Sequence, residues 1–296
     1  MAAALVLSLA AACQDGPERA ARSPVHTGVV VASFDFAESR LLAEIYSEAL
    51  ESAGVAVRRE FELGPRELVL PALRQGFVDV VPEYAGSALD AVAPRSRADR
   101  SDARAVLAAL AAAVEPWGLE VLSPAEASND NVLAVTTRFA TETGIRTTSD
   151  LARLAPTLTI GGPPECPQRP RCLLGLAGVY GLRFDDFVPL PGQELVRQAL
   201  RDGVIDVGVL FTTDAVLAGD EFVVLEDDRR LQPAENVVPV ARRDVLDPRV
   251  TAALDAVSGR LTTSNLRFLN WRVANAGTSI ATEAHAWLVR QGLVAR

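Results

Sequence analysis

The chain has 296 residues, of which 49% are hydrophobic, so it can form one large domain or two lobes with separate cores. The net charge of −9 argues against a nucleic-acid partner, because phosphate binding depends on clustered cationic side chains. The sequence contains no lysine, which excludes Schiff-base catalysis and the lysine-containing phosphate loop.

The N-terminal stretch "MAAALVLSLAAACQDG" combines a short apolar run, small residues and a cysteine. The run at residues 2–12 is too short to span a bilayer. It resembles a bacterial lipoprotein signal peptide, in which Cys13 becomes the lipidated first residue of the mature protein. Two features depart from that pattern, since no Arg or Lys precedes the run and Ala10 replaces a larger aliphatic residue. An ordinary apolar terminus is the alternative, and residues 14–27 are typical of a polar tether.

From residue 28 onward, strand-like and helix-like segments alternate in the first half of the chain. The predicted strands are residues 27–33, 55–63, 78–82, 119–122 and 131–137. The predicted helices are residues 39–54, 65–76 and 101–118. Gly54 is expected to end the first of these helices. The second helix begins at Pro65. Its other proline, Pro71, must lie near the start of that helix to be tolerated.

The second half repeats this alternation. Its predicted helices are residues 149–154, 172–181, 193–203 and 213–219, followed by a helical pattern over 248–292. Its predicted strands are residues 157–162, 187–190, 204–211, 221–227 and 235–241. Ser149 is the expected cap of the first helix. The pattern predicts an α/β protein whose mostly parallel sheets are flanked by helices.

Two similar phrases recur, "LRQGFVDVVPEYAGS" and "LRDGVIDVGVLFTTD". Each contains a helix end, a glycine stop, a buried strand and an aromatic residue at the carboxyl end of that strand. Ligands bind outside the carboxyl ends of strands in open α/β sheets. Tyr84 and Phe211 are therefore predicted to present their rings to a ligand, one from each half of the chain. The alternative is that both rings only cap their sheets.

Two of the three cysteines, Cys166 and Cys172, lie close together in the proline-rich stretch "GGPPECPQRPRCLLGL". Export would place them in an oxidising compartment, where a disulfide between them can persist. Zinc binding is the weaker alternative, because only two His residues occur and neither is nearby in sequence. Trp117, Trp271 and Trp287 fall among helical apolar positions, so packing in the cores is expected for them.

Four stretches together resemble a known family: "VVVASFDFAESRLLAEIYSEALESAG", "ELVLPALRQGFVDVVPEYAGSAL", "LTIGGPPECPQRPRCLLGL" and "VLFTTDAVLAGDEFVVLEDD". The resemblance is to substrate-binding proteins of osmoprotectant (glycine betaine, choline and carnitine) ABC importers. It implies a two-lobed periplasmic-binding-protein fold whose lobes close on the ligand. Lobe one would comprise residues 28–131 and 237–296, and lobe two residues 132–236. "NVLAV" and "ENVVPVA" would be the crossing segments.

The resemblance also implies ligand-binding residues. Tyr84 matches the cage tyrosine of the family's "PEYTGT" phrase, and Ser87 matches its final hydroxyl. Phe211 matches the tyrosine of "DAYSTD". Arg169 matches the arginine that follows "GGPPE" and holds a ligand carboxylate. The proposed Cys166–Cys172 disulfide would hold Arg169 in place.

Three positions depart from the family's pattern. Asn131 and Arg197 replace two cage tyrosines, and Phe34 replaces the lysine of "GSKNFTE". An arginine in a cage repels a quaternary ammonium group, so a different polar or anionic ligand is also possible. Ligand binding at all seven positions (Phe34, Tyr84, Ser87, Asn131, Arg169, Arg197 and Phe211) is therefore a prediction.

The resemblance implies a lipid-anchored receptor outside the cytoplasm that delivers a small solute to an ABC permease with its ATPase. The alternative is a ligand sensor of the same fold that acts on a signalling partner. An enzyme is not expected, because the sequence offers no nucleophile–base pair or acid–base dyad. No cofactor and no metal are expected.

Overall fold

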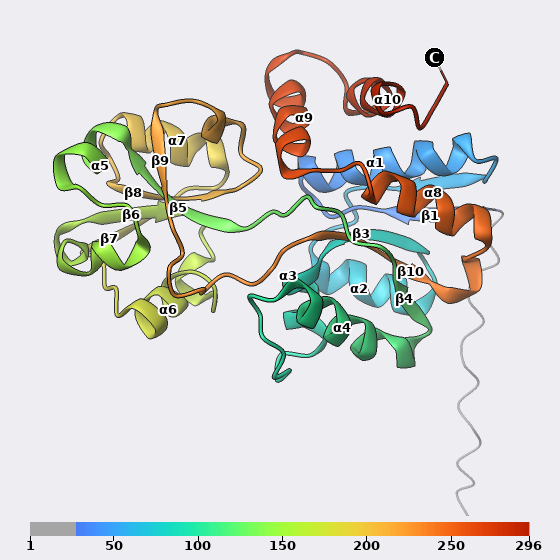
Figure 1. Cartoon of the computed structure of the whole chain (residues 1–296), viewed down its shortest axis with the longest axis horizontal. Coiled ribbons are helices and arrows are strands. Elements are labelled where there is room, and N and C mark those ends of the chain that lie inside the picture. The colour runs from blue at the N-terminus through green and yellow to red at the C-terminus, as the bar shows by residue number, and fades with distance from the viewer. Residues whose placement is uncertain (1–27, 296) are drawn as a thin grey trace, which may run out of the picture.

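The computed structural model describes residues 28–295, which form two lobes connected by two crossing segments (Figure 1). Each lobe is built on its own five-stranded sheet. The predicted signal peptide and tether, including Cys13, lie outside the described residues. Between residues 28 and 295, no helix has the length and apolar character required to cross a membrane.

The sheet of lobe one has the strand order β2-β1-β3-β10-β4. Its strands are β1 (Val29–Ala32), β2 (Val57–Glu60), β3 (Val80–Tyr84), β4 (Leu119–Val121) and β10 (Val237–Arg242). β1 is parallel to β2 and β3, whereas β10 runs antiparallel to both β3 and β4. Every residue of β1 and β3 is buried, because helices cover both faces of the sheet.

The helices of lobe one are α1 (Ala37–Ser52), α2 (Arg66–Gln75), α3 (Ala85–Val92), α4 (Ala103–Val114), α8 (Pro248–Ser258), α9 (Thr263–Asn275) and α10 (Ile280–Gln291). α1 packs against α8 and α10 on one face of the sheet, and α3 packs against α4 on the other (Figure 1). The apolar face predicted for α1 is buried, with Leu41, Ile45 and Leu50 fully covered. α9 lies on the side of lobe one nearest lobe two (Figure 1).

The sheet of lobe two has the order β7-β6-β8-β5-β9. Its strands are β5 (Asn131–Thr136), β6 (Thr159–Gly162), β7 (Asp186–Pro189), β8 (Val207–Phe211) and β9 (Phe222–Leu225). Its helices are α5 (Thr137–Thr143), α6 (Leu173–Gly175) and α7 (Gln193–Arg201). β6 is parallel to β7 and β8, and β5 is antiparallel to β8 and β9. Each sheet thus has one reversed strand, and the prediction of mostly parallel α/β sheets is confirmed.

The crossing segments are residues 122–130, which lead from β4 to β5, and residues 226–236, which lead from β9 to β10. They run side by side, because Ser128 and Asn236 form an antiparallel bridge and Asn129 N donates to the Glu235 carbonyl at 3.1 Å. The predicted crossing segments differ from these. "NVLAV" lies in β5 and most of "ENVVPVA" lies in β10, so their backbone groups bond within the two sheets. The predicted lobe boundaries at residues 131 and 237 remain predictions.

Two local predictions are wrong. The cap of the helix near residue 150 is Thr147 instead of Ser149: Thr147 Oγ1 accepts from Asp150 N, and the Asp150 carboxylate accepts from Thr147 N. Trp271 is 45% exposed and stacks on Phe268, so it is not a core residue, whereas Trp287 is fully buried as predicted.

Pro71 differs from expectation, because it lies in the interior of α2, past its first turn. Trp117 packs, partly buried, against the core of lobe one, as predicted.

A glycine after β3 sets the distance between α3 and the second crossing segment. A Cβ atom on Gly86 would lie 2.6 Å from Pro233 Cβ and 3.0 Å from the Ala234 carbonyl oxygen. We expect Gly86→Ala to lower the free energy of unfolding by about 1–3 kcal/mol, because the added methyl group overpacks this contact. Urea denaturation measures the change. Gly178→Ala is the matched control, because no atom outside its own helix lies within 4 Å of the added Cβ; an equal loss in both variants would contradict the explanation.

Candidate functional site

Three aromatic rings lie in a row near the carboxyl ends of β1 and β3. Phe34 stacks on Phe36 with ring centroids 6.0 Å apart, and Phe36 stacks on Tyr84 at 6.1 Å. Phe34 and Tyr84 are buried, whereas Phe36 is 42% exposed. These three residues are called the aromatic row below. Phe36 is not among the predicted site residues, although its position just beyond a strand end was a usable signal.

The carboxylate of Glu38, on α1, is buried beside this row. Tyr84 Oη donates to Glu38 Oε1 at 2.7 Å, and Asn129 Nδ2 donates to the same oxygen at 2.8 Å. Asn270 Nδ2 donates to Glu38 Oε2. Burial raises the pKa of Glu38, and the hydrogen bonds donated to its carboxylate oppose that rise. The Tyr84 ring is thus held through its hydroxyl group by Glu38 of α1. Donors from α9 and from the first crossing segment hold the same carboxylate in place.

This network continues into lobe two through the loop after β8. Thr213 Oγ1 donates to Asn129 Oδ1 at 3.1 Å, and the Thr213 carbonyl accepts from Asn270 Nδ2 at 3.3 Å. Arg267, on α9, donates to the Thr212 carbonyl at 2.6 Å. Hydrogen bonds therefore hold this loop of lobe two against lobe one.

Arg66 places a cation on the outer end of the aromatic row. Its guanidinium carbon lies 4.9 Å from the centroid of the Phe34 ring. The same guanidinium forms a two-pronged ion pair with the buried carboxylate of Glu83, with the shortest distance 2.9 Å. The ring of Phe34 therefore already has a cation partner, whereas Phe36 is the most exposed residue of the row.

Ser87 does not present a free hydroxyl. Its Oγ donates to Glu235 Oε1 at 2.6 Å, and its backbone N donates to Glu235 Oε2 at 2.9 Å. Burial raises the pKa of Glu235 to about 7, against the opposing effect of the Ser87 hydrogen bonds and the nearby Arg66. Ser87 thus connects α3 to the second crossing segment.

In lobe two, Asn131 and Phe211 are direct partners in the β5–β8 ladder. Asn131 Nδ2 donates to Gln232 Oε1 at 3.3 Å, and Phe211 is partly exposed. Tyr84 has a matching position in lobe one, because it pairs with Val237, the first residue of β10. A crossing segment therefore enters each sheet beside one of the two predicted rings. Among the described residues, no ring stacking joins Phe211 to the aromatic row.

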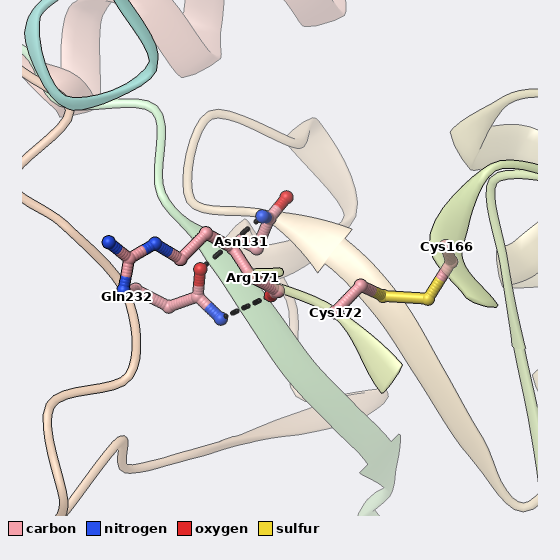
Figure 2. The surroundings of a disulfide bond; sticks show 5 residues. All are labelled: Asn131, Cys166, Arg171, Cys172 and Gln232. Carbon is pink, nitrogen blue, oxygen red and sulfur yellow. Dashed lines mark hydrogen bonds between the residues drawn. A yellow bond between two sulfur atoms is a disulfide. The ribbon is translucent and has the colours of Figure 1, made fainter. Parts of the chain in front are cut away.

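Cys166 and Cys172 are joined by a disulfide bond (Figure 2). The adjacent residue, Arg171, connects this loop to the second crossing segment. Arg171 Nη1 donates to the Leu231 carbonyl at 2.9 Å. Gln232 Nε2 donates to the Arg171 carbonyl at 3.0 Å (Figure 2). Arg171 Nε also lies 3.4 Å from Asp90 Oδ2 on α3 of lobe one.

The predicted ligand-binding arginine in this loop is Arg169. Its side chain is exposed and makes no ion pair or hydrogen bond to any residue within 28–295. Arg171, which was not predicted, is the arginine of this loop that reaches lobe one. Its partners are far away in sequence, so local pattern gave no signal for it.

Arg197 lies on α7, where it forms an ion pair with Glu194. Its charge is therefore partly balanced within its own helix. The structure thus brings Phe34 and Tyr84 together in lobe one, and Asn131 and Phe211 together in lobe two. Within residues 28–295, neither Arg169 nor Arg197 forms a hydrogen bond or an ion pair with any of these four residues.

A cavity of about 670 Å³ adjoins the crossing segments. Asn131, Thr212, Asp227, Arg230 and Gln232 are among its lining residues, but neither Tyr84 nor Phe211 lines it. Across residues 28–295, no group of three or more His, Cys, Asp or Glu side chains could hold a metal ion.

Comparison with protein families gives one match over most of the chain. Residues 27–290 match the family described as the substrate binding domain of an ABC-type glycine betaine transport system. The chain belongs to this family. It is thus a substrate-binding protein of an ABC transport system, which binds a small ligand and works with a permease, and it is not an enzyme.

Individual relatives agree with this assignment. The chain is 30% identical to the glycine-betaine-binding protein of Pseudomonas aeruginosa over 250 residues, which cover 80% of this chain and 79% of the relative. It is 26% identical to the glycine betaine-binding protein YehZ of Escherichia coli over 284 residues, 92% of each protein. A crystal structure titled as a glycine betaine/carnitine/choline ABC transporter shares the fold, with a TM-score of 0.78, 22% identity, and coverage of 90% of this chain and 99% of that chain.

The raised pKa of Glu235 predicts a specific dependence of this substrate-binding protein's stability on pH. The folded state holds the proton of Glu235 up to about pH 7, whereas the unfolded state releases it near the ordinary value of 4.5. The stabilisation is complete below pH 4.5 and is lost as the pH rises to about 7.

We expect Glu235→Gln to remove this contribution, because the amide stays neutral at every pH. The difference in unfolding free energy between wild type and variant should change by up to about 3 kcal/mol between pH 4.5 and 8. Urea denaturation across that range measures it, with the exposed Glu142→Gln as a control for net charge. Parallel pH profiles for wild type and Glu235→Gln would show that this carboxyl group does not titrate near neutral pH.

Proposed function

We propose that this substrate-binding protein captures a small quaternary ammonium solute between its two lobes and delivers it to its permease. The observation that carries this proposal is the aromatic row beside the buried carboxylate of Glu38. A quaternary ammonium group has no N–H to donate, so hydrogen bonds cannot recognise it. Ring faces attract such a cation by roughly 0.5–2 kcal/mol each, and a nearby carboxylate adds to that attraction.

Within the row, Phe36 and Tyr84 are the rings we assign to the ligand. Phe36 is the most exposed of the three, and Phe34 is already covered by Arg66. The ion pair between Arg66 and Glu83 offsets the charge that would otherwise repel a cationic ligand. Phe34 therefore supports the neighbouring ring, and the predicted direct contact of Phe34 with ligand is the weaker assignment.

Phe211 and Asn131 supply the opposing wall from lobe two. Closure would bring this pair toward the aromatic row, since ligands of two-lobed proteins are held by hinge closure. Arg169 has an exposed guanidinium with no partner among the described residues, which suits the carboxylate of a zwitterionic ligand such as glycine betaine. Ser87 contributes by holding Glu235 and the crossing segment in place.

The cellular setting follows from the N-terminal pattern and the family. Lipidation at Cys13 would anchor the protein on the outer face of the cell membrane, with residues 14–27 as a tether to the lobes. The partner is then an ABC permease with its ATPase. The alternative of a signalling receptor would use the same ligand and lobes, but the family match is to a transport system.

The ring assignment predicts the effect of removing single aromatic side chains. We expect Phe36→Ala, Tyr84→Ala and Phe211→Ala each to weaken glycine betaine binding about 2- to 30-fold, because each removes one cation–ring contact. The Tyr84→Ala and Phe211→Ala effects should be non-additive in the double variant, since both rings contact one ligand. Isothermal titration calorimetry measures the affinities.

Phe77→Ala is the matched control, because Phe77 is an exposed ring before β3, at the opposite end of that strand from Tyr84. Phe36→Ala keeps the test independent of folding, because its ring is not part of the core. Wild-type affinity in both Phe36→Ala and Phe211→Ala would refute a ligand site between the lobes.

The anchor has its own test. Cys13→Ser should move the protein from the membrane fraction to the soluble fraction, because the substitution removes the lipidation site and stable anchoring requires multiple acyl chains. Cell fractionation followed by immunoblotting measures the distribution. Cys166→Ser is the control, because it leaves the N-terminal cysteine intact; unchanged membrane partitioning of Cys13→Ser would exclude the lipoprotein assignment.

A further inference from the structure

The cavity beside the crossing segments is a separate space from the aromatic row. Its volume is about 670 Å³, which suits a small organic molecule, and neither Phe36 nor Tyr84 lines it. Both crossing segments, the ends of β5 and β9, and Ser101 of lobe one form its walls. Asn131 is the one proposed ligand contact that borders it. The cavity thus lies next to the proposed ligand site but has its own lining.

The inner wall of this cavity is apolar. Four leucine side chains from the core of lobe two line it, and none is more than 8% exposed: Leu133, Leu176, Leu225 and Leu231. Covering such a wall removes apolar surface from water, which favours association. An occupant of the cavity therefore gains from having an apolar body.

The first crossing segment adds a carboxylate to the lining, that of Asp130. Its Oδ2 accepts a hydrogen bond from Ser128 Oγ at 2.7 Å, and its backbone N donates to Thr212 Oγ1 at 2.9 Å. Among residues 28–295, no side chain forms an ion pair with Asp130. Burial raises the pKa of Asp130, and the hydrogen bond from Ser128 opposes that rise. A partly buried carboxylate thus lines the cavity without a cation beside it.

Two further carboxylates make these surroundings negative. Asp227 also lines the cavity and is held in place by the backbone N–H groups of Leu231 and Gln232, at 3.0 and 2.7 Å. Glu235 is buried in the second crossing segment, and the charge of Asp130 adds to the burial that raises its pKa. A cation in the cavity would relieve the repulsion among these groups.

Arg230 is the one basic residue among those that line the cavity, and it is exposed. Hydrogen bonds from Ser101 lower the pKa of Asp99, and the charge of Arg230 adds to that effect, so this guanidinium acts on an exposed carboxylate. Across residues 28–295, no group of three or more His, Cys, Asp or Glu side chains could hold a metal ion. The lining therefore suits an organic cation better than a metal ion.

We propose that this cavity binds a second small molecule, an organic ammonium ion with N–H donors and an apolar body, which acts as an effector of lobe movement. The ammonium group would donate to Asp130 while the body covers the leucine wall. Hinge segments absorb the backbone changes that accompany domain closure. An occupant that contacts both crossing segments therefore restrains those changes. This inference goes beyond the transported solute and does not depend on its identity.

Other classes of ligand fit the cavity less well. A carboxylate or phosphate would be repelled by Asp130 and Asp227. A neutral alcohol donates one hydrogen bond but leaves the negative charge uncompensated. A quaternary ammonium group carries the charge but has no N–H to donate. Only a protonated amine forms a charge-assisted hydrogen bond to the carboxylate.

The test compares three probes that share one apolar body. They are 2-phenylethylamine, its neutral counterpart 2-phenylethanol, and its N,N,N-trimethyl derivative, with affinities measured by isothermal titration calorimetry near neutral pH. We expect the wild-type protein to bind 2-phenylethylamine about 10- to 100-fold more tightly than either of the others, because only this probe brings both charge and N–H donors to the carboxylate.

The variant Asp130→Asn assigns that preference to the cavity. The amide has the same size and can still accept from Ser128, but it carries no charge. The preference should fall to less than about threefold, and an unchanged circular dichroism spectrum checks the fold. Asp185→Asn is the matched control and should keep the wild-type preference. It removes one charge from an exposed site before β7, at the opposite edge of the sheet from β9.

Hydrogen–deuterium exchange followed by mass spectrometry locates the bound amine. We expect 2-phenylethylamine to slow exchange in both crossing segments, residues 122–130 and 226–236, in the wild type but not in Asp130→Asn. Protection confined to the region of the aromatic row would overturn the proposal, since the amine would then occupy the proposed solute site. Unchanged exchange in the crossing segments would overturn the effector role.

The binding data can also refute the site. Equal or absent binding of the three probes by the wild type would overturn it, as would a preference that survives in Asp130→Asn. Failure of glycine betaine to bind would count against the proposed function alone, because none of these measurements uses that compound.

Discussion

The buried carboxylate of Glu38 is the interaction on which the arrangement of the lobes and the rings depends. A charge removed from water is tolerated only when hydrogen-bond donors surround it. Here the donors are Tyr84, Asn129 and Asn270, which come from β3, a crossing segment and α9. Satisfying one carboxylate therefore fixes the positions of three separate parts of the chain. Thr213 adds lobe two to the same network.

This constraint fixes the tyrosine ring that we propose as a ligand contact. The Tyr84 hydroxyl is committed to Glu38, so the ring orientation is set before any ligand arrives, and only ring faces are left for recognition. Preorganised contacts bind more tightly, because less conformational entropy is lost when the ligand enters. The Ser87–Glu235 pair and the Arg171 contacts hold the second crossing segment in a similar way.

Three arginines of this acidic chain are each paired with a carboxylate, which is consistent with the cationic ligand proposed for the aromatic row. Arg66 is paired with Glu83, Arg171 with Asp90, and Arg197 with Glu194. The resemblance implies that Asn131 and Arg197 stand where the family has tyrosines, which would make the proposed wall from lobe two more polar than an all-aromatic cage. The site as proposed would combine rings from lobe one with hydrogen-bonding groups from lobe two.

The sequence by itself determined the α/β class, the order of most helices and strands, and the places of Tyr84 and Phe211 at strand ends, because periodicity and glycine or proline stops act over a few residues. Family resemblance added the two lobes. Only the tertiary structure decided the hydrogen bonds of Glu38 and Arg171, as well as the exposure of Trp271. Glu38 and Asn270 are 232 residues apart in the chain, and nothing in local pattern encodes a hydrogen bond that exists only once distant segments have packed together.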